Sequence, residues 1–281
     1  MGNLLVIVKK EFTDLLNSKL IIIILLAYLV PIFLNIYIFQ SRLDQGTISQ
    51  SDVFELSLGS SLFTISYYGG LIAVVIGCSS IASEKHNHAL NVLLTKPLQR
   101  TTVINGKLLG IFSFLFVVLA IAVILYVSSI LIISGSAIQA YFFTFILRIP
   151  VVLLMSLAYC MVFSSLSILV STIVRSQMLA LTISTFSIVL SQLVITDNFA
   201  GTISLVFQSM FGISSDEVCY YIVNLFPPGI IGLTGYRGLF NPLLSIGDVL
   251  NAYAVNLVTL GAEAVLFTLI CYVAFMRKDI E

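Results

Sequence analysis

The sequence contains few residues that could carry out chemistry. His86 and His88 are its two histidines and follow Cys78, so a metal site with cysteine and histidine ligands is the first chemistry to consider. Cys78 lies within an apolar run, however, and no fourth ligand is near it in the sequence, which favours a solvated helix face over a metal site. Ser60 and Ser61 have no histidine placed to act as their base, as proteolysis within a membrane would require. We therefore expect no metal and no enzymatic site.

A second chemistry to consider is nucleotide hydrolysis. Gly106-Lys107 supplies the Gly-Lys pair of the phosphate-binding motif G-x-x-x-x-G-K-[ST], but Leu108 follows it and Thr101 stands where the first glycine belongs. The chain is therefore not expected to hydrolyse ATP by this route or to hold a cofactor of its own. A formal net charge of +0, without a basic run, also argues against nucleic acid as a partner.

Glu263 is an isolated acidic residue in the middle of the last apolar run of the chain. An ionised carboxylate at that depth in a membrane is costly, so the side chain is expected to face a partner or a cavity. Two interpretations stay open. Glu263 either lines a pathway through the membrane or a subunit interface, or it makes a purely structural hydrogen bond.

The elements that must position these residues lie in a membrane. The chain of 281 residues is 59% hydrophobic and 9% charged, with a mean hydropathy of +1.12, whereas soluble domains carry roughly 25% charged residues. Apolar runs long enough to cross about 30 Å of hydrocarbon as helices lie at residues 20–39, 62–82, 108–133, 149–174, 178–195 and 252–276. We therefore predict an all-α polytopic membrane protein with six transmembrane helices, forming a single domain over residues 1–281.

The lysines and arginines predict the orientation, because loops that are rich in them stay in the cytosol. With the N-terminus inside, the cytosolic side receives Lys9, Lys10, Lys19, Lys85, Lys96, Arg100, Lys107, Arg175, Arg277 and Lys278. Only Arg42, Arg148 and Arg237 then lie outside. Both ends of the chain are therefore expected in the cytosol. Charged residues interrupt the apolar ones near the N-terminus (Lys9, Lys10, Glu11 and Asp14), and no small-residue cleavage site follows Val30-Pro31, so the first run is expected to stay in the mature protein.

Two further segments complete the predicted architecture. Residues 3–17 carry apolar residues at three- and four-residue spacing, which predicts an amphipathic helix in the cytosolic interface or, alternatively, an extension of the first span. The external segment 196–251 contains apolar pieces, such as 199–211 and 230–239, that are too short to span and are broken by glycine and proline. These pieces fit re-entrant half-helices between spans five and six, with a surface loop carrying interfacial helices as the alternative.

The most informative segment is residues 84–100, between the second and third runs. Glu84 would stand in the first turn of a helix that Pro97 prevents from continuing. One face of this helix is apolar, formed by Leu90, Leu93 and Leu94. The pattern predicts a short amphipathic helix at the cytosolic surface, and its apolar face needs a cover, either lipid or another protein.

This pattern resembles that of the ABC-2 permeases, the membrane subunits of type 2 ABC exporters. In that family an acidic residue ends the second span, and a Leu-Leu pair, a proline, a basic residue and a Gly-Lys pair follow. The corresponding residues here are Glu84, Leu93-Leu94, Pro97, Arg100 and Gly106-Lys107. Within the family, the chain looks like the subgroup that includes the nitrous-oxide-reductase maturation permease.

The resemblance implies partners. It implies a permease that exports its substrate together with two separate ATPase subunits, which bind the ATP and Mg²⁺, and with a second permease, either a copy of this chain or a related one. The segment 84–100, the N-terminal helix and the turn at Arg175 would dock on the ATPases, whose closure would move the spans as rigid bodies. In this docking segment the charged residues would orient the contact: Glu84, Lys85 and Arg100. The buried contact would come from Leu90, Leu93 and Leu94, and Pro97 belongs to the same segment.

Other interpretations of the same features remain. The charges of the docking segment satisfy the positive-inside rule even without an ATPase. A membrane assembly or scaffold component could also use the permease architecture without moving a substrate. The localisation expected under the family resemblance is the plasma membrane of a bacterium or archaeon.

Overall fold

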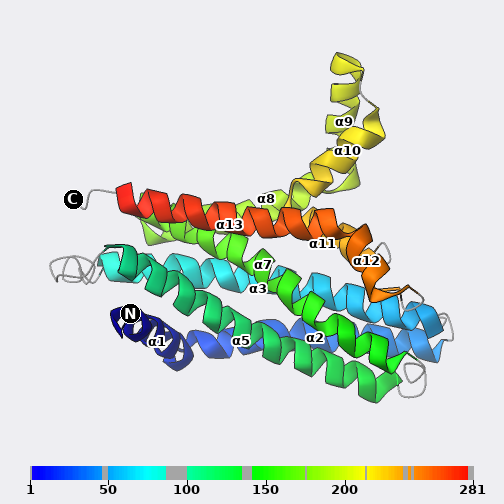
Figure 1. The fold of residues 1–281 in the computed structure, drawn as a ribbon, viewed down its shortest axis with the longest axis horizontal. Coiled ribbons are helices and arrows are strands. Elements are labelled where there is room, and N and C mark those ends of the chain that lie inside the picture. Colours follow the sequence, from blue (N-terminus) through cyan, green and yellow to red (C-terminus); the bar gives the residue numbers. More distant parts are fainter. Residues whose placement is uncertain are drawn as a thin grey trace.

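The chain folds into a bundle of long helices with a group of short helices at its side (Figure 1). The computed structural model describes residues 2–45, 50–86, 100–134, 141–174, 176–212, 214–236, 240–241 and 244–277. Within these residues every regular element is an α-helix and no strand occurs, so the all-α prediction is confirmed. The first helix and the end of the last helix lie at the same end of the bundle, which we call the terminal end (Figure 1).

Six helices within the described ranges are long and apolar enough to cross a membrane. They are α2 (Leu20–Asp44), α3 (Gln50–His86), α5 (Arg100–Ser134), α7 (Phe142–Ile173), α8 (Gln177–Val194) and α13 (Ala254–Arg277). Each predicted run falls on one of them, which confirms a polytopic membrane protein. With 37 and 35 residues, α3 and α5 are about 50 Å long and therefore extend beyond a hydrocarbon core of about 30 Å.

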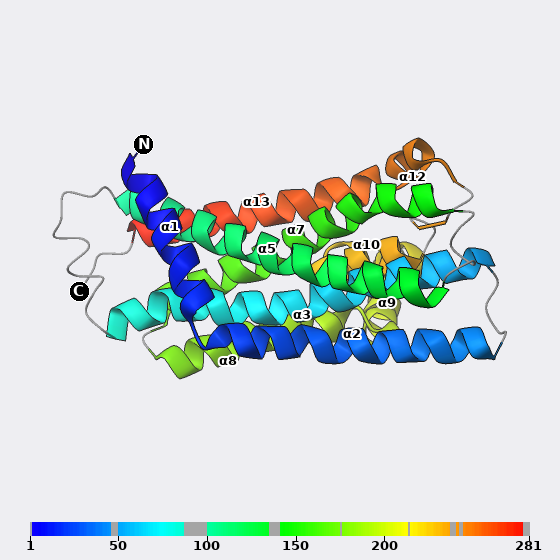
Figure 2. The ribbon, with the colours of Figure 1, turned by 90° about the horizontal axis from the view of Figure 1, so that it is seen from below.

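Helix α3 lies among the other long helices, and its most extensive contact is with α7 (Figure 2). The two backbones approach closely because glycines line the contact. A Cβ atom added at Gly77 would lie 2.7 Å from the carbonyl oxygen of Ser164, and one added at Gly70 would lie 2.6 Å from the ring of Tyr159. Small residues of this kind are how membrane helices pack without a hydrophobic driving force.

Serine hydroxyls add hydrogen bonds across the same contact. Ser66 donates to the hydroxyl of Ser156 over 3.0 Å, and both groups are buried. Two further serines of α7 donate to backbone carbonyls of α3: Ser167 to Val74 at 2.7 Å and Ser171 to Cys78 at 3.2 Å. Each such bond contributes about 0.6 kcal/mol in a membrane, so the set supplements the close packing rather than replacing it.

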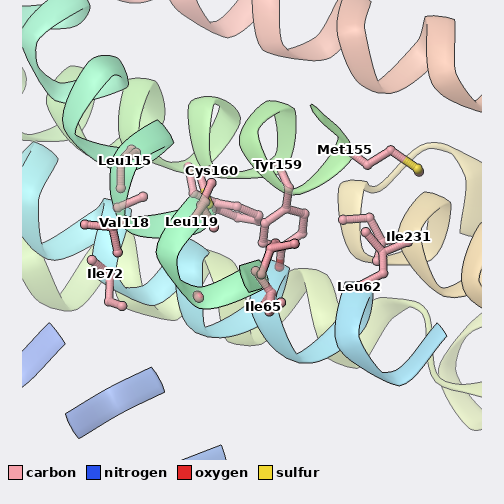
Figure 3. Close-up of a cluster of buried hydrophobic side chains, with 14 of the residues drawn as sticks. Leu62, Ile65, Ile72, Leu115, Val118, Leu119, Met155, Tyr159, Cys160 and Ile231 are labelled. Carbon is pink, nitrogen blue, oxygen red and sulfur yellow. The ribbon is translucent and has the colours of Figure 1, made fainter. Parts of the chain in front are cut away.

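The buried apolar core joins α3, α5, α7 and α11 (Pro227–Tyr236). Figure 3 shows side chains from all four helices meeting around Tyr159, with Leu62 and Ile65 from α3, Leu119 from α5 and Ile231 from α11. Helix α2 is tied to this core by polar contacts, since Tyr28 donates to the carbonyl of Ile65 over 3.2 Å. Its other side exposes large apolar residues, as expected of a face in contact with lipid: Ile22, Ile23, Leu26, Val30 and Phe33.

The N-terminal segment forms a separate helix, α1 (Gly2–Asn17), as predicted for residues 3–17. A turn at Ser18 separates α1 from α2, and the Ser18 hydroxyl donates to the carbonyl of Leu15 over 2.8 Å. The alternative prediction, in which these residues extend the first span, is therefore wrong. Helix α1 lies crosswise to the long helices and packs on α5 at the terminal end (Figure 2).

In its described residues, the segment between α8 and α13 forms four short helices, as predicted for short apolar pieces broken by glycine and proline. They are α9 (Asp197–Phe211), α10 (Ser215–Asn224), α11 and α12 (Ile246–Ala252). Gly212 ends α9 with a φ of 70°, a left-handed conformation that costs glycine little. Helices α9 and α10 pack on each other and stand out from the side of the bundle (Figure 1).

The packing of α3 on α7 makes a testable prediction at Gly77. We expect Gly77→Ala to destabilise the protein by about 1–3 kcal/mol, because the added methyl group meets backbone that cannot move aside as a side chain can. The measurement is the thermal unfolding midpoint of the detergent-purified protein. Gly201→Ala in α9 is the control, since no atom lies within 4 Å of its added Cβ, and it should not lower the midpoint. Equal midpoints for the two variants would contradict the close approach.

Candidate functional site

The structure describes the two flanks of the predicted docking segment, and both lie at the terminal end of the bundle (Figure 1). Glu84 and Lys85 belong to the last turn of α3, which ends at His86, and Arg100 is the first residue of α5. The remaining residues assigned to docking lie outside the described residues: Leu90, Leu93, Leu94 and Pro97. Arg175, in the turn between α7 and α8, also lies outside them.

An ion pair lies just inside this flank, where α1, α3 and α5 meet. The Lys107 ammonium on α5 donates to Glu11 Oε1 on α1 over 2.9 Å. The same ammonium donates to the carbonyl oxygen and the hydroxyl of Ser80 on α3, over 3.2 Å and 3.4 Å. One side chain therefore connects three helices, and two of them lead directly into the docking segment.

Two glycines allow α1 to come this close to α5. A Cβ atom added at Gly106 would lie 2.5 Å from the Ile7 side chain, and one added at Gly110 would lie 2.7 Å from Glu11 Cβ. Gly106 and Gly110 are four residues apart and therefore lie on the same face of α5. Phe12 packs edge-on against Phe114 one turn further along, with ring centroids 6.2 Å apart. The junction is therefore tightly packed around the ion pair.

Burial makes this ion pair different from a surface salt bridge. The Lys107 side chain is 2% exposed and that of Glu11 is 12% exposed. Removing both charges from water carries a large desolvation penalty, which mutual attraction and further hydrogen bonds must offset. The Ser80 oxygens supply such hydrogen bonds to the ammonium. Separating α1 from α5 would leave two charges unpaired, so the pair holds α1 in one position.

The sequence interpretation did not assign Glu11 a function and placed α1 in the lipid interface. The signal that could have identified the contact is the Gly106-x-x-x-Gly110 spacing, which is the helix-packing motif of membrane proteins. Lys107 lies between these glycines. Glu11 lies one turn after Ile7, on the face of α1 that packs against the two glycines. The Gly106-Lys107 pair, which carried part of the family resemblance, therefore has a structural role here.

A second buried cation lies toward the other end of the bundle. Arg148, near the start of α7, is 2% exposed and donates to the carbonyl oxygen of Leu244 over 2.9 Å. Apolar side chains enclose it, including Phe240 and Val249. Arg148 thus fixes the chain segment that enters α12, where Ser245 caps the helix by accepting from the Asp248 amide over 3.2 Å. This hydrogen bond has a structural role, because the arginine holds the backbone at Leu244 in place.

Glu263, the third group of interest, lies in the middle of α13 and is partly buried. Its Oε2 atom is inaccessible to solvent and has no hydrogen-bond partner among the described residues. The neighbouring polar contact between α13 and α7 is made further along, where Thr268 and Ser165 lie 3.1 Å apart. The structural hydrogen bond considered for Glu263 is therefore not made by Oε2 within the described part of the chain.

The closed contact between α3 and α7 also limits where a substrate could pass. Glycines and hydrogen-bonded serines fill this contact, and a single methyl group would not fit at Gly77. A permeation path between these two helices would require them to separate. The outer face of α13, by contrast, has a shallow apolar groove lined by Val258, Gly261, Ala262, Val265, Leu266, Leu269 and Ile270.

Comparison with known families gives one match that covers nearly the whole sequence. A family model described as ABC-2 family transporter protein matches residues 5–280. The matched range includes α1 except for its first three residues and, among the described residues, the six long helices and the four short ones. No curated protein matches the chain.

The junction at Lys107 predicts how the protein responds to removal of each charge. We expect Glu11→Leu or Lys107→Met to destabilise the protein by about 3–5 kcal/mol, because each leaves one buried charge without its partner. The double change Glu11→Leu with Lys107→Met should recover most of this loss, since no charge remains. Thermal unfolding midpoints of the purified variants measure both effects.

The matched control for this prediction is Lys10→Met, which removes an exposed lysine from α1 and should change stability by no more than about 0.5 kcal/mol. If the double variant were as unstable as the sum of the single ones, the stabilisation would not come from pairing.

Proposed function

Because the chain belongs to the ABC-2 family of transporter proteins, we propose that this permease component of an ABC transporter couples ATP hydrolysis by separate ATPase subunits to substrate export. The observation that carries the proposal is the match over residues 5–280, which spans the entire helical bundle. The likeness of residues 84–100 to the permease of nitrous-oxide-reductase maturation is part of the same hypothesis.

The proposed orientation places the terminal end in the cytosol of a bacterial or archaeal cell. Lys9, Lys10 and Lys107 belong to elements at this end, and Arg277 ends α13 there. Basic residues concentrate on the cytosolic side of membrane proteins, which supports this orientation in the plasma membrane. The flanks of the docking segment then face the compartment that contains ATP.

The proposed assembly contains two permeases and two ATPases. A second permease is supported by the closed contact of α3 with α7, which leaves the path to form at a surface shared between two chains. The groove on α13 supports the same idea, because Gly261 has open space around it where another helix could pack. In this arrangement Glu263 lies on the helix that would border the path.

The proposed docking role of residues 84–100 is tested at the leucine pair. We expect Leu93→Asp with Leu94→Asp to abolish co-purification of the ATPase subunit with the affinity-tagged permease, because charges would enter a buried apolar contact. The measurement is the amount of ATPase that remains bound, together with its identity by mass spectrometry.

The matched control is Tyr220→Asp with Tyr221→Asp on α10, an adjacent and exposed pair far from the terminal end, which should leave ATPase retention unchanged. Undiminished retention in the leucine variant would contradict the docking role. An ATPase that binds but is never stimulated in liposomes would support a scaffold instead of a transporter.

Glu263 provides a test of the path itself. We expect Glu263→Gln to reduce ATP-dependent transport while leaving the amount of assembled complex unchanged, because the amide has the same size but cannot carry charge. Uptake into inverted vesicles, normalised to the permease content, measures the effect. Ser165→Ala removes the hydroxyl next to Thr268 and serves as a control for a polar contact that only joins α7 to α13. Unchanged transport in Glu263→Gln would remove this residue from the path.

A further inference from the structure

The junction of α1, α3 and α5 has a geometry that the proposed docking role alone does not require. Ser80 lies shortly before the end of α3 at His86, and Lys107 lies two turns after the start of α5 at Arg100. The ammonium of Lys107 therefore joins the two helices that enter and leave the docking segment. Glu11 attaches α1 to the same point.

The contacts of α1 show that it is fastened to the protein and does not merely rest on the membrane. The face of α1 that is turned toward α5 packs against Gly106 and Gly110, and Phe12 packs against Phe114. Glu11 is buried between α1 and α5, so sliding of α1 would expose or separate a pair of charges. An interfacial helix held only by lipid would show neither the close backbone approach nor a buried carboxylate.

We propose that Lys107 is a positioning residue that locks α1 to α5 and α3, so that α1 moves together with the two helices flanking the docking segment as one rigid body during transport. This inference rests on the proposed function, because it concerns how ATPase motion reaches the spans. Glu11 and Ser80 complete the lock from the other two helices.

A covalent link between α1 and α5 tests this proposal directly. Ile7 and Gly106 suit a pair of cysteines, because a Cβ at Gly106 would lie 2.8 Å from Ile7 Cβ, and a disulfide requires about 3.5–4.5 Å. Replacing Ile7 by cysteine removes the Cγ2 atom that lies 2.5 Å from this position, and a separation of the two Cβ atoms by about 1 Å more reaches the disulfide range. The variant Ile7→Cys with Gly106→Cys is purified as a complex with its ATPase, reconstituted in liposomes and given Mg-ATP, with and without oxidation.

The expected result is an ATP hydrolysis rate that does not differ between the oxidised and the reduced complex, because the linked helices never part. A rate that falls on oxidation and returns on reduction would overturn the proposal. The native chain and the single Gly106→Cys variant are oxidised in parallel as controls for the four native cysteines.

A rescue experiment separates positioning from simple structural stabilisation. In the same double-cysteine background, Lys107→Met should lower the hydrolysis rate of the reduced complex about tenfold, and oxidation should restore most of it. A variant that had only lost stability would not recover when an already assembled complex is oxidised. If Lys107→Met does not assemble, Lys107→Gln takes its place, because it removes the charge that pairs with Glu11 and keeps a polar side chain.

The two hypotheses fail in different ways. Lack of rescue despite complete disulfide formation would overturn the role of Lys107 while the unsubstituted complex stays active. An unsubstituted complex that shows no ATP-dependent transport would instead contradict the proposed function, and the inference with it.

Discussion

The close contact between α3 and α7 is the constraint on which the rest of the bundle depends. Helices in hydrocarbon gain little from burying apolar side chains against each other, because lipid tails are equally apolar. Dense packing and hydrogen bonds must hold them, and both require the backbones to approach closely. Gly70 and Gly77 permit that approach, and serines of α7 use it to reach carbonyls of α3. Helices α2, α5, α8 and α11 then pack around α3, so their positions follow from this one contact.

Lys107 and Arg148 differ from Glu263 in the hydrogen bonds that their buried polar atoms make. Lys107 and Arg148 lie toward opposite ends of the bundle, and each fastens one element to another through hydrogen bonds to oxygen atoms. Glu263 lies in the middle of α13, at the edge of the bundle, and its Oε2 atom has no hydrogen-bond partner within the described residues. This atom therefore contributes no hydrogen bond to the packing of α13 within the described residues, unlike the Lys107 ammonium and the Arg148 guanidinium.

The sequence allowed the spans to be predicted because hydrocarbon thickness sets their length, and runs such as 108–133 have no other explanation. Helix α1 was also predicted from its spacing, but its contact was not, because Glu11 and Lys107 lie 96 residues apart and nothing local connects them. The Gly106-x-x-x-Gly110 spacing was present in the sequence, but the spacing alone does not identify which helix packs against these glycines. The direction of α9 and α10 could not be predicted either, since it depends on the turn at Gly212 and on their mutual packing. Glu263 was identified from its depth alone, whereas the lack of a partner for its Oε2 atom among the described residues can be seen only in the structure.

The separation of Glu11 from Lys107 has a consequence for how the protein is made. Ribosomes add roughly 5–20 residues per second, so on the order of 5–20 s pass between the synthesis of Glu11 and that of Lys107. During this interval α1 has neither its ionic partner nor the glycine face of α5, and its carboxylate has only water to solvate it. Helices α2 and α3 are synthesised before α5, so Ser80 is already in place when Lys107 arrives. The junction can therefore form only when the third of the six spans has been inserted beside the first two.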